Sequence, residues 1–533
     1  MSQLSALTQK LSKSSPQAVF TAKSLFDHGP SDVFDYLYIE TEIEKHYKET
    51  LSKYRELNSI IFLCGSSGDG KSAIIGQNQR FFEKYYDVHI DATHSFRPDQ
   101  SAVEALNEVF DKYKLNSKSL VVGINIGILL NFAREGSDDH TDIKESIKHY
   151  MDTKGSKNNV YYINFEDYSK FKMSEREVDS AFIHELLDKV TEQSSTNPFY
   201  TAFKNDSQDD SYDIEHINFQ LLSQEAIKRS IVELLVTVHL KYDQFLTTRS
   251  LLDFIYTLIT GPKLLIDQLF EYKSNAIIEN ISKEDPCKLR TSKLDSFILE
   301  RASKQVDSQL YQYISTFNEL LQSNIFSVDN STLLIRLFYL FRNHDWSSNY
   351  HHQFKSEFYD HTTYDFINLL HAHKEYKNTQ DRDLIRKFYS ELEEAIMAYS
   401  NRKSPELSKK DLITLSEINN YVLCTAIEFA PNWKEIEKFN EHMLHLFPSF
   451  LNVNSKSTGK LLISLNTYRL IKAINEGYRP NKHDRNTIIL FEELIEKIID
   501  IAKDTQKILI IQDDKVHEFK NREGEIEVKS HGR

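Results

Sequence analysis

The sequence predicts an α/β core, built on a parallel sheet with flanking helices, followed by a large mainly α-helical region and a short β-containing C-terminal tail. Glycine is scarce and concentrates near the N-terminus: six of the 14 glycines lie from Gly65 to Gly127, and only five lie beyond Gly155. In the first third of the chain, short apolar segments alternate with helical or polar stretches. This alternation is typical of a parallel sheet.

The expected strands are residues 59–64, 86–93, 119–126 and 160–167. The most apolar stretch, residues 120–133, is about 14 residues long and contains two asparagines. Because a bilayer requires roughly 20 residues, we expect a buried strand and the helix after it. Residues 384–399 repeat apolar side chains at helical spacing, which predicts a helix buried along one stripe.

Changes in composition and the positions of glycine, proline and polar clusters divide the chain into five expected parts. They are an N-terminal helical segment (1–57), the α/β core (58–205), a helical lid-like domain (206–345), a second helical domain (346–450) and a C-terminal region (451–533). The last part carries a basic stretch, one amphipathic helix and short antiparallel strands around a turn at residues 521–524.

Charge and cysteine content exclude several classes of protein. The 65 Lys and Arg residues face 79 Asp and Glu residues, a net charge of −14, so any nucleic-acid contact must be local. Cys64, Cys287 and Cys424 form no CxxC pair, which argues against a disulfide framework and a zinc ribbon. The N-terminus shows no secretory signal. We therefore expect a cytoplasmic protein without membrane contact.

A phosphate-binding motif follows the first expected strand. Residues 65–72, GSSGDGKS, match G-x-x-x-x-G-K-[ST] without a mismatch. Glycine lets successive N–H groups converge on an anion, lysine reaches the β- and γ-phosphates, and the hydroxyl suits Mg²⁺. The pattern is typical of a P-loop NTPase and predicts ATP and Mg²⁺ binding by Gly65, Ser66, Ser67, Gly68, Asp69, Gly70, Lys71 and Ser72.

Hydrolysis also needs a group that orients Mg²⁺ and another that orients water, and here the sequence leaves alternatives open. Asp91 ends an expected strand but lies only twenty residues after Lys71. Asn125 sits at the usual distance and suits sensing the γ-phosphate or water better than holding metal. Glu166 and Asp167 end the fourth expected strand. The metal is therefore held by Ser72 with Asp91, by the Glu166/Asp167 pair, or by Ser72, phosphates and waters alone.

Several cationic residues outside this loop are weaker candidates. Arg336 and Arg342 are candidate sensor arginines of a helical lid, although such arginines more often belong to a solvated helix face. A stretch that is basic in an otherwise acidic chain predicts a nucleic-acid or partner contact, with the solvated surface as the alternative. Its members are Arg469, Lys472, Arg479, Lys482 and Arg485.

Two further groups carry little functional signal. Asp513 and Asp514 with Glu527 and Lys529 resemble an acid, acid-x-lysine arrangement for phosphodiester cleavage, but a charged surface hairpin explains them equally well. The histidines, including the 351–352 pair, show no spacing that indicates metal binding, and we expect surface or capping roles.

Several sequence segments of the chain resemble the DptF family of DNA phosphorothioation-dependent restriction proteins. They are LSKSSPQAV, IIFLCGSSGDGKS, HIDATHSF, VVGINIG and YRPNKHDRNTIILFEEL, and they span roughly residues 11–495. The resemblance implies an intracellular bacterial ATPase that works with the companion subunits DptG and DptH against DNA lacking the phosphorothioate mark. The family's loop carries over as Gly65, Gly70, Lys71 and Ser72. No nuclease residue carries over.

Two functions follow as competing expectations. The first is an ATP-driven switch or motor subunit of a DNA restriction complex. The second is a nucleotide-dependent assembly or signalling ATPase without direct DNA contact, which the net charge of −14 favours. A small-molecule kinase fits less well, because the expected helical region far exceeds the lid that such an enzyme needs.

Overall fold

The computed structural model describes residues 2–14, 33–92, 100–174, 177–208, 213–303, 307–376, 379–438, 445–481, 484–505, 507–512, 515–522 and 525–532. The chain divides into two compact units. The first comprises Met1–Lys172 and Asp179–Tyr359, and the second comprises Met173–Val178 and Asp360–Arg533. The finer division into five parts stays a prediction.

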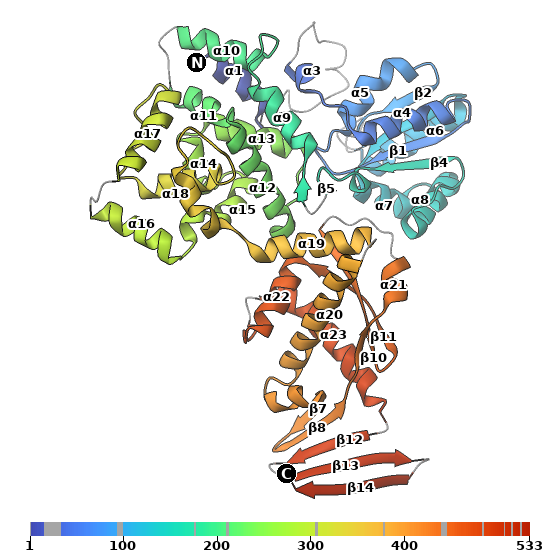
Figure 1. The fold of residues 1–533 in the computed structure, drawn as a ribbon. Coiled ribbons are helices and arrows are strands. Elements are labelled where there is room, and N and C mark those ends of the chain that lie inside the picture. Colours follow the sequence, from blue (N-terminus) through green and yellow to red (C-terminus); the bar gives the residue numbers. More distant parts are fainter. Residues whose placement is uncertain are drawn as a thin grey trace. The chain divides into compact units, whose positions relative to one another are not determined.

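The first unit contains the predicted parallel sheet. Its four strands are β1 (Ile60–Cys64), β2 (Tyr86–His89), β3 (Ser119–Ile124) and β4 (Val160–Asn164), in the order β2-β3-β1-β4 (Figure 1). All pairings are parallel, and β1 lies between β3 and β4. β2, β3 and β4 end earlier than predicted. The chain enters a loop after β2, a helix after β3 and a 3-10 turn after β4.

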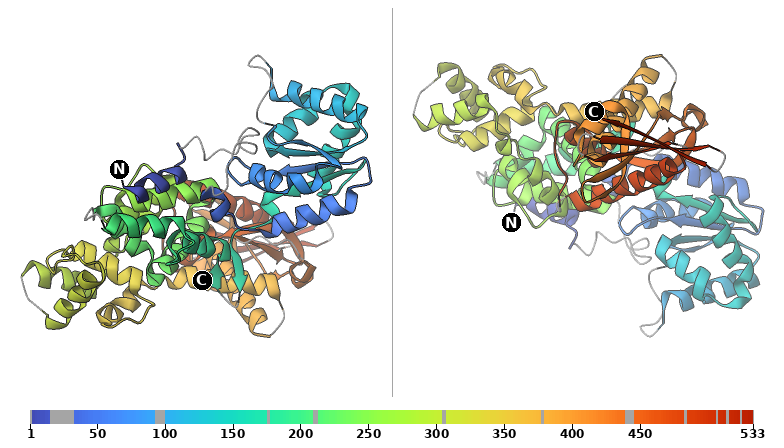
Figure 2. Two further views of the ribbon diagram at one scale, coloured as in Figure 1. Left: turned by 90° about the horizontal axis from the view of Figure 1, so that it is seen from above. Right: turned by 90° about the horizontal axis from the view of Figure 1, so that it is seen from below.

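Helices cover both faces of this sheet (Figures 1 and 2). One face packs against α4 (Glu42–Tyr54) and α5 (Lys71–Phe82), and the other against α6 (Ala102–Leu115), α7 (Ile126–Glu135) and α8 (Thr141–Thr153). Side chains alternate between faces along each strand, so Ile61 and Leu63 join the first core while Phe62 joins the second. A parallel sheet covered on both faces explains why its strands read as continuous apolar segments.

The rest of the first unit is helical, as predicted. A long buried helix, α12 (Glu225–Tyr242), packs against α9, α15 and α18. Other helices and 3-10 turns of this unit include α1 (Gln3–Thr8), α3 (Val33–Leu37), η4 (Phe165–Asp167), α9 (Ala181–Thr191), α13 (Thr248–Thr260), α14 (Leu265–Glu271), α15 (Ala276–Ile281), α18 (Ser331–Phe341) and η7 (Tyr350–Phe358).

The second unit mixes helices with a three-stranded and a five-stranded antiparallel sheet, and most of a two-stranded sheet, β5 (Lys172–Ser174) with β6 (Glu177–Asp179), also belongs to it. Its helices are α19 (His361–Glu375), α20 (Thr379–Ser400), α21 (Trp433–Lys438), α22 (Leu465–Asn475) and α23 (Arg485–Lys503). α20 buries Ile385, Phe388 and Leu392 along one stripe, which confirms the predicted amphipathic helix. A three-stranded sheet has the order β11-β10-β9 and comprises β9 (Phe429–Pro431), β10 (Leu446–Val453) and β11 (Lys456–Ser464).

The larger sheet has the order β14-β13-β12-β8-β7. Its strands are β7 (Leu412–Ile418), β8 (Tyr421–Ala426), β12 (Lys507–Gln512), β13 (Lys515–Arg522) and β14 (Glu525–Gly532). The antiparallel tail is therefore confirmed, although residues 521 and 522 belong to β13 rather than to a turn. The predicted helical character of residues 346–450 is wrong for β7, β8, β9 and the start of β10, whereas α21 within this range is helical. The alternating segments LITLSEI and YVLCTA pair with each other as a hairpin, and β12 of the tail pairs with the other edge of β8.

No helix in the described part of the chain combines the length and the apolar character needed to cross a lipid bilayer.

Candidate functional site

The glycine-rich loop connects β1 directly to α5. Gly68 and Gly70 adopt φ values of +87° and +111°, a left-handed region that favours glycine. Gly70 occupies the N-cap position of α5, and no side chain caps this helix. Since the first turn of a helix leaves its N–H groups without intrahelical partners, the start of α5 presents donors and the positive end of the helix dipole to an anion.

Lys71 lies at the start of α5 and is only 8% exposed. Its Nζ donates hydrogen bonds to the carbonyl oxygens of Gly65 (3.0 Å) and Ser66 (2.7 Å). Burial lowers the pKa of Lys71, while the negative charges of Asp69 and Asp91 oppose that shift. The ammonium group is thus poorly hydrated, a state in which a phosphate would interact with it strongly.

The side chain of Asp69 interacts within the loop and with Lys170. Its Oδ2 accepts a hydrogen bond from the backbone N–H of Ser66 at 2.7 Å, and its Oδ1 lies 4.0 Å from Nζ of Lys170. Burial raises the pKa of Asp69, against the opposing charge of Lys170. Asp69 therefore positions the loop, and its predicted place among the phosphate-binding residues stays a prediction.

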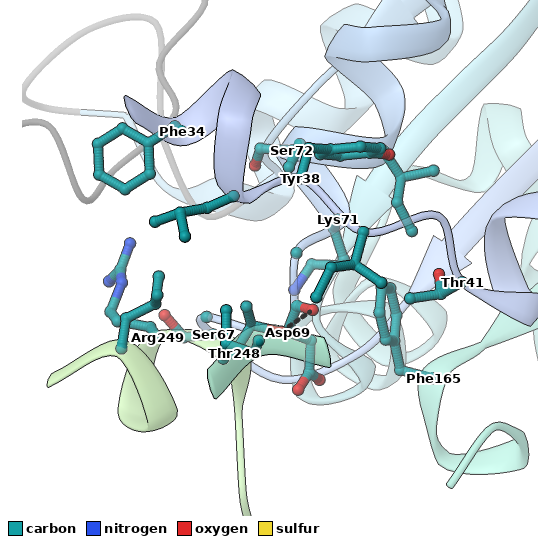
Figure 3. A pocket seen from close by; sticks show the side chains of 18 of the residues that line it. Phe34, Tyr38, Thr41, Ser67, Asp69, Lys71, Ser72, Phe165, Thr248 and Arg249 are labelled. Atoms are coloured by element: carbon teal, nitrogen blue, oxygen red, sulfur yellow. Dashed lines mark hydrogen bonds between the residues drawn. The ribbon is translucent and has the colours of Figure 1, made fainter. Parts of the chain in front are cut away.

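A pocket of about 1370 Å³, including its open mouth, lies over this loop. Figure 3 shows Lys71 and Ser72 facing Arg249 across it, with Phe34 and Tyr38 on another wall. Its polar part is lined by Ser67, Gly68, Asp69, Gly70, Lys71, Ser72, Asp91, Asn125, Thr248 and Arg249. Its apolar part is lined by Leu11, Phe34, Leu37, Ile39, Phe165, Phe182, Leu186 and Leu252, from the N-terminal segment, η4, α9 and α13. The pocket is thus polar beside the loop and apolar farther away.

The candidate acids differ in their access to this pocket. Asp91 lines it and acts electrostatically on Lys71. Asn125 also lines it, but its Oδ1 accepts a hydrogen bond from the N–H of Gly127 (2.7 Å) and caps α7. Glu166 and Asp167 lie on η4 with exposed side chains and do not contribute to the lining. The geometry favours Asp91 over the Glu166/Asp167 pair.

The carboxyl ends of the parallel strands explain this result. β3 lies directly beside β1, and β2 lies beyond β3, so the residues after both strands reach the edge where the loop stands. The backbone N–H of Ala92 donates to the carbonyl oxygen of Gly123 at 2.9 Å, which ties the segment containing Asp91 to the end of β3. β4 also ends at this edge, but its chain turns into η4 and presents Phe165 to the pocket.

Thr248 and Arg249, at the start of α13, line this pocket beside the loop and were not among the predicted site residues. The N–H of Arg249 donates to the carbonyl oxygen of Gly68 (3.2 Å), and Oγ1 of Thr248 donates to the carbonyl oxygen of Asp69 (3.3 Å). The charge of Arg249 also contributes to lowering the pKa of Lys71. No sequence pattern marks these residues, because they lie about 180 positions from the loop.

The two arginines proposed as sensors hold the helical region together instead. Arg336 is 3% exposed and donates to Asp267 (2.7 Å), Glu271 (2.6 Å) and Asp285 (2.5 Å). Arg342 is also buried and pairs with Glu233. Both interpretations in the sequence analysis, a sensor and a solvated helix face, are therefore wrong for these side chains.

The basic stretch is partly neutralised within the second unit. Arg469 pairs with Asp360 and donates to Oγ1 of Thr363, and Nζ of Lys472 donates to Glu391 at 2.6 Å. Arg479 is exposed, whereas Lys482 and the side chain of Arg485 lie outside the described residues. The contact of these five residues with nucleic acid or a partner stays a prediction.

The remaining sequence candidates give no metal site. Asp513 and Asp514 lie outside the described residues, and Lys529 pairs with Glu527 on its own strand at 3.2 Å. Within the described ranges, no cluster of three or more His, Cys, Asp or Glu side chains could hold a metal ion. The expected surface or capping role is wrong for His351, which is buried and donates from Nε2 to the carbonyl oxygen of His344.

Comparisons with protein-family models, curated proteins and solved structures found no match for this chain.

Proposed function

We propose that the chain binds ATP with Mg²⁺ at the 65–72 loop and hydrolyses it as a nucleotide-driven switch. The observation that carries this proposal is the pocket over the loop, where the uncapped start of α5, the desolvated ammonium of Lys71 and the carboxylate of Asp91 meet. Their combination suits a polyphosphate and its metal ion better than a neutral ligand.

Each residue has a role in this proposal. Lys71 would exchange its bonds to the Gly65 and Ser66 carbonyls for phosphate oxygens. Ser72, in the first turn of α5, and Asp91 supply the hydroxyl and carboxylate oxygens that Mg²⁺ prefers. When bound, Mg²⁺ would neutralise charge that develops on the phosphates. The apolar part of the pocket, which includes Phe34 and Phe182, suits a nucleobase.

A switch also needs a moving part that senses the nucleotide, and α13 supports that part of the proposal. Thr248 and Arg249 connect the loop to α13, which packs against α11 (Ile214–Leu222) and α14. A phosphate beside Arg249 would attract the start of α13, and its loss would release it. Nucleotide state would thus be transmitted to the helical region.

We further propose that this switch serves a bacterial, cytoplasmic DNA restriction complex that depends on phosphorothioation, with companion subunits DptG and DptH. The support is the resemblance of the phrases between residues 11 and 495, together with the large helical region available for partner contacts. Co-purification of the tagged chain with these two subunits, with and without ATP, tests this assignment. Absence of both subunits under either condition contradicts it.

The nucleotide part is tested with Lys71→Ala and Lys84→Ala. Lys84 follows α5, is exposed and provides the matched loss of one lysine charge outside the pocket. Titration with a fluorescent ATP analogue should show at least a ten-fold loss of affinity for Lys71→Ala, because a charge-assisted hydrogen bond contributes about 1.5–3 kcal/mol. Lys84→Ala should bind like the parent chain. Equal affinities of all three proteins would refute the site.

The metal-binding acid is tested by Asp91→Asn and Glu166→Gln in a Mg²⁺-dependent phosphate-release assay. Asp91 lines the pocket and Glu166 does not, so only the first change should lower turnover and raise the Mg²⁺ requirement. Loss confined to Glu166→Gln would show that η4 supplies the metal ligand.

The alternative function, a nucleotide-dependent assembly ATPase without direct DNA contact, is favoured by one observation. Two of the five predicted cationic contacts, Arg469 and Lys472, are already paired with carboxylates in a chain of net charge −14. Binding to duplex DNA at low salt, with affinity falling as salt rises, would support direct contact. Absence of binding at low salt, with ATP turnover retained, would support the alternative.

A further inference from the structure

Strand β14 ends the five-stranded sheet, and its outer edge is a candidate interface. Within the described residues, the sheet order pairs it with β13 alone (Figure 1). It extends over eight residues, Glu525–Gly532, and its pairing with β13 has no register shift. A long, regular edge strand without proline or a bulge presents a row of backbone donors and acceptors to another strand.

Two apolar side chains on this strand are unusually exposed. Ile526 is 70% exposed and Val528 is 52% exposed. They lie on one face of the strand with Ser530, and Glu525, Glu527 and Lys529 lie on the other. Directly opposite on β13, Phe519 pairs with Val528. β14 therefore has an apolar face and a charged face at the margin of the sheet.

The order of charges along the strand makes it complementary to itself. In an antiparallel pair of two β14 strands centred on Val528, each Glu527 lies opposite Lys529 of the other copy, and Val528 lies opposite Val528. Moving the centre to Glu527 brings two glutamates together, and moving it to Lys529 brings two lysines together. Slipping by a single residue in the pairing would place apolar side chains beside charged ones. The Val528-centred register therefore has the best electrostatic match.

We propose that β14 is a self-association surface, through which two copies of this chain pair their edge strands about a twofold axis. The pairing joins two five-stranded sheets into one continuous sheet and satisfies the backbone groups of both edges. It places each Val528 beside its counterpart, which removes apolar surface from water. Lys529 also contacts Glu527 of its own strand at 3.2 Å, so the dimer extends an existing charge arrangement.

The test uses the full chain and two edge variants of opposite charge. Lys529→Glu makes the edge acidic at positions 525, 527 and 529, whereas the double variant Glu525→Lys/Glu527→Lys makes it basic. Sedimentation equilibrium should show a dimer for the parent chain. Each variant alone should self-associate at least about ten-fold more weakly, because the symmetry replaces two attractive pairs with two repulsive ones. A mixture of the two variants should form the mixed dimer with near-parental affinity.

The mixture also separates edge pairing from damage to the hairpin. Glu527 and Lys529 lie opposite Lys520 and Glu518 on β13, so either variant weakens contacts within one chain. That damage persists in the mixture, whereas repulsion between edges does not. Lys515→Glu, the same charge change on β13 opposite Gly532 and outside the outer edge, should leave the dimer intact. A monomeric parent chain, a dimer that Lys529→Glu does not weaken, or a mixture that fails to associate would overturn the proposal.

Discussion

Gly123 should be essential for placing Asp91, and this can be tested with a single methyl group. Gly123 lies near the end of β3, where the segment after β2 crosses close to it. A Cβ added at Gly123 would lie 2.3 Å from the carbonyl oxygen of Ile90 and 2.9 Å from Cδ1 of Ile75. The nearer atom belongs to the backbone and cannot rotate away, so Gly123→Ala must displace the segment that carries Asp91.

The size of the displacement follows from the contact. Ordinary van der Waals contact begins at 3.4 Å, so the carbonyl of Ile90 must retreat by 3.4 − 2.3 Å, about 1.1 Å. Overpacking of this kind costs about 1–3 kcal/mol of folding free energy. A misplacement of about 1 Å at a catalytic group can cost on the order of a hundred-fold in rate. Gly123→Ala should therefore lose both stability and ATP turnover.

Urea denaturation and phosphate release measure the two effects. Gly155→Ala is the matched control, because its added Cβ would meet only side-chain atoms of Thr153 and His149, at 3.1 Å and 3.3 Å. The control should stay within about 0.5 kcal/mol of the parent chain. An equally stable Gly123→Ala would refute the packing argument. Reduced stability with full turnover would show that the position of Asp91 does not matter for hydrolysis.

Three further predictions concern other charged groups. Arg336→Met should destabilise the first unit by about 3–5 kcal/mol in urea denaturation, because it leaves the buried carboxylate of Asp285 and the partly buried carboxylate of Asp267 without their partner; a loss below about 1 kcal/mol would contradict this. Burial lowers the pKa of His373 from 6.5 to about 4 in the folded chain. Between pH 6.5 and 4 the unfolded chain therefore binds more protons than the folded chain, and the free energy of unfolding decreases as the pH is lowered. From pH 8 to 5 the second unit should lose about 2 kcal/mol through this group, and His373→Phe should lack that share; identical pH profiles would disprove it. Arg249→Ala should weaken ATP binding about ten-fold but adenosine binding little, and equal losses for both ligands would show that Arg249 does not contact the phosphates.

The glycine-rich loop and the parallel sheet could be predicted from the sequence, because local residue patterns indicate both. The glycines of residues 65–72 impose their own backbone conformations, and the apolar segments of β1 and β3 are buried on both faces. The helical spacing of α20 is equally local. The strands β7 and β8 were missed although they alternate in sequence and pair with each other as a local hairpin. Only the second neighbour of β8, the strand β12, comes from a segment about 80 residues later.

The sequence by itself determined that a glycine-rich loop with lysine and serine follows a buried strand and leads into a helix, since these local patterns depend on neighbouring residues alone. Only the tertiary structure decided which acid and which arginine face the loop. Asp91 lines the pocket and the Glu166/Asp167 pair does not, while the choice of metal ligand stays a prediction, and Arg249 was not considered at all. The reason is physical: contacts between strand ends and helix starts depend on packing between segments far apart in the chain, and no local periodicity encodes them.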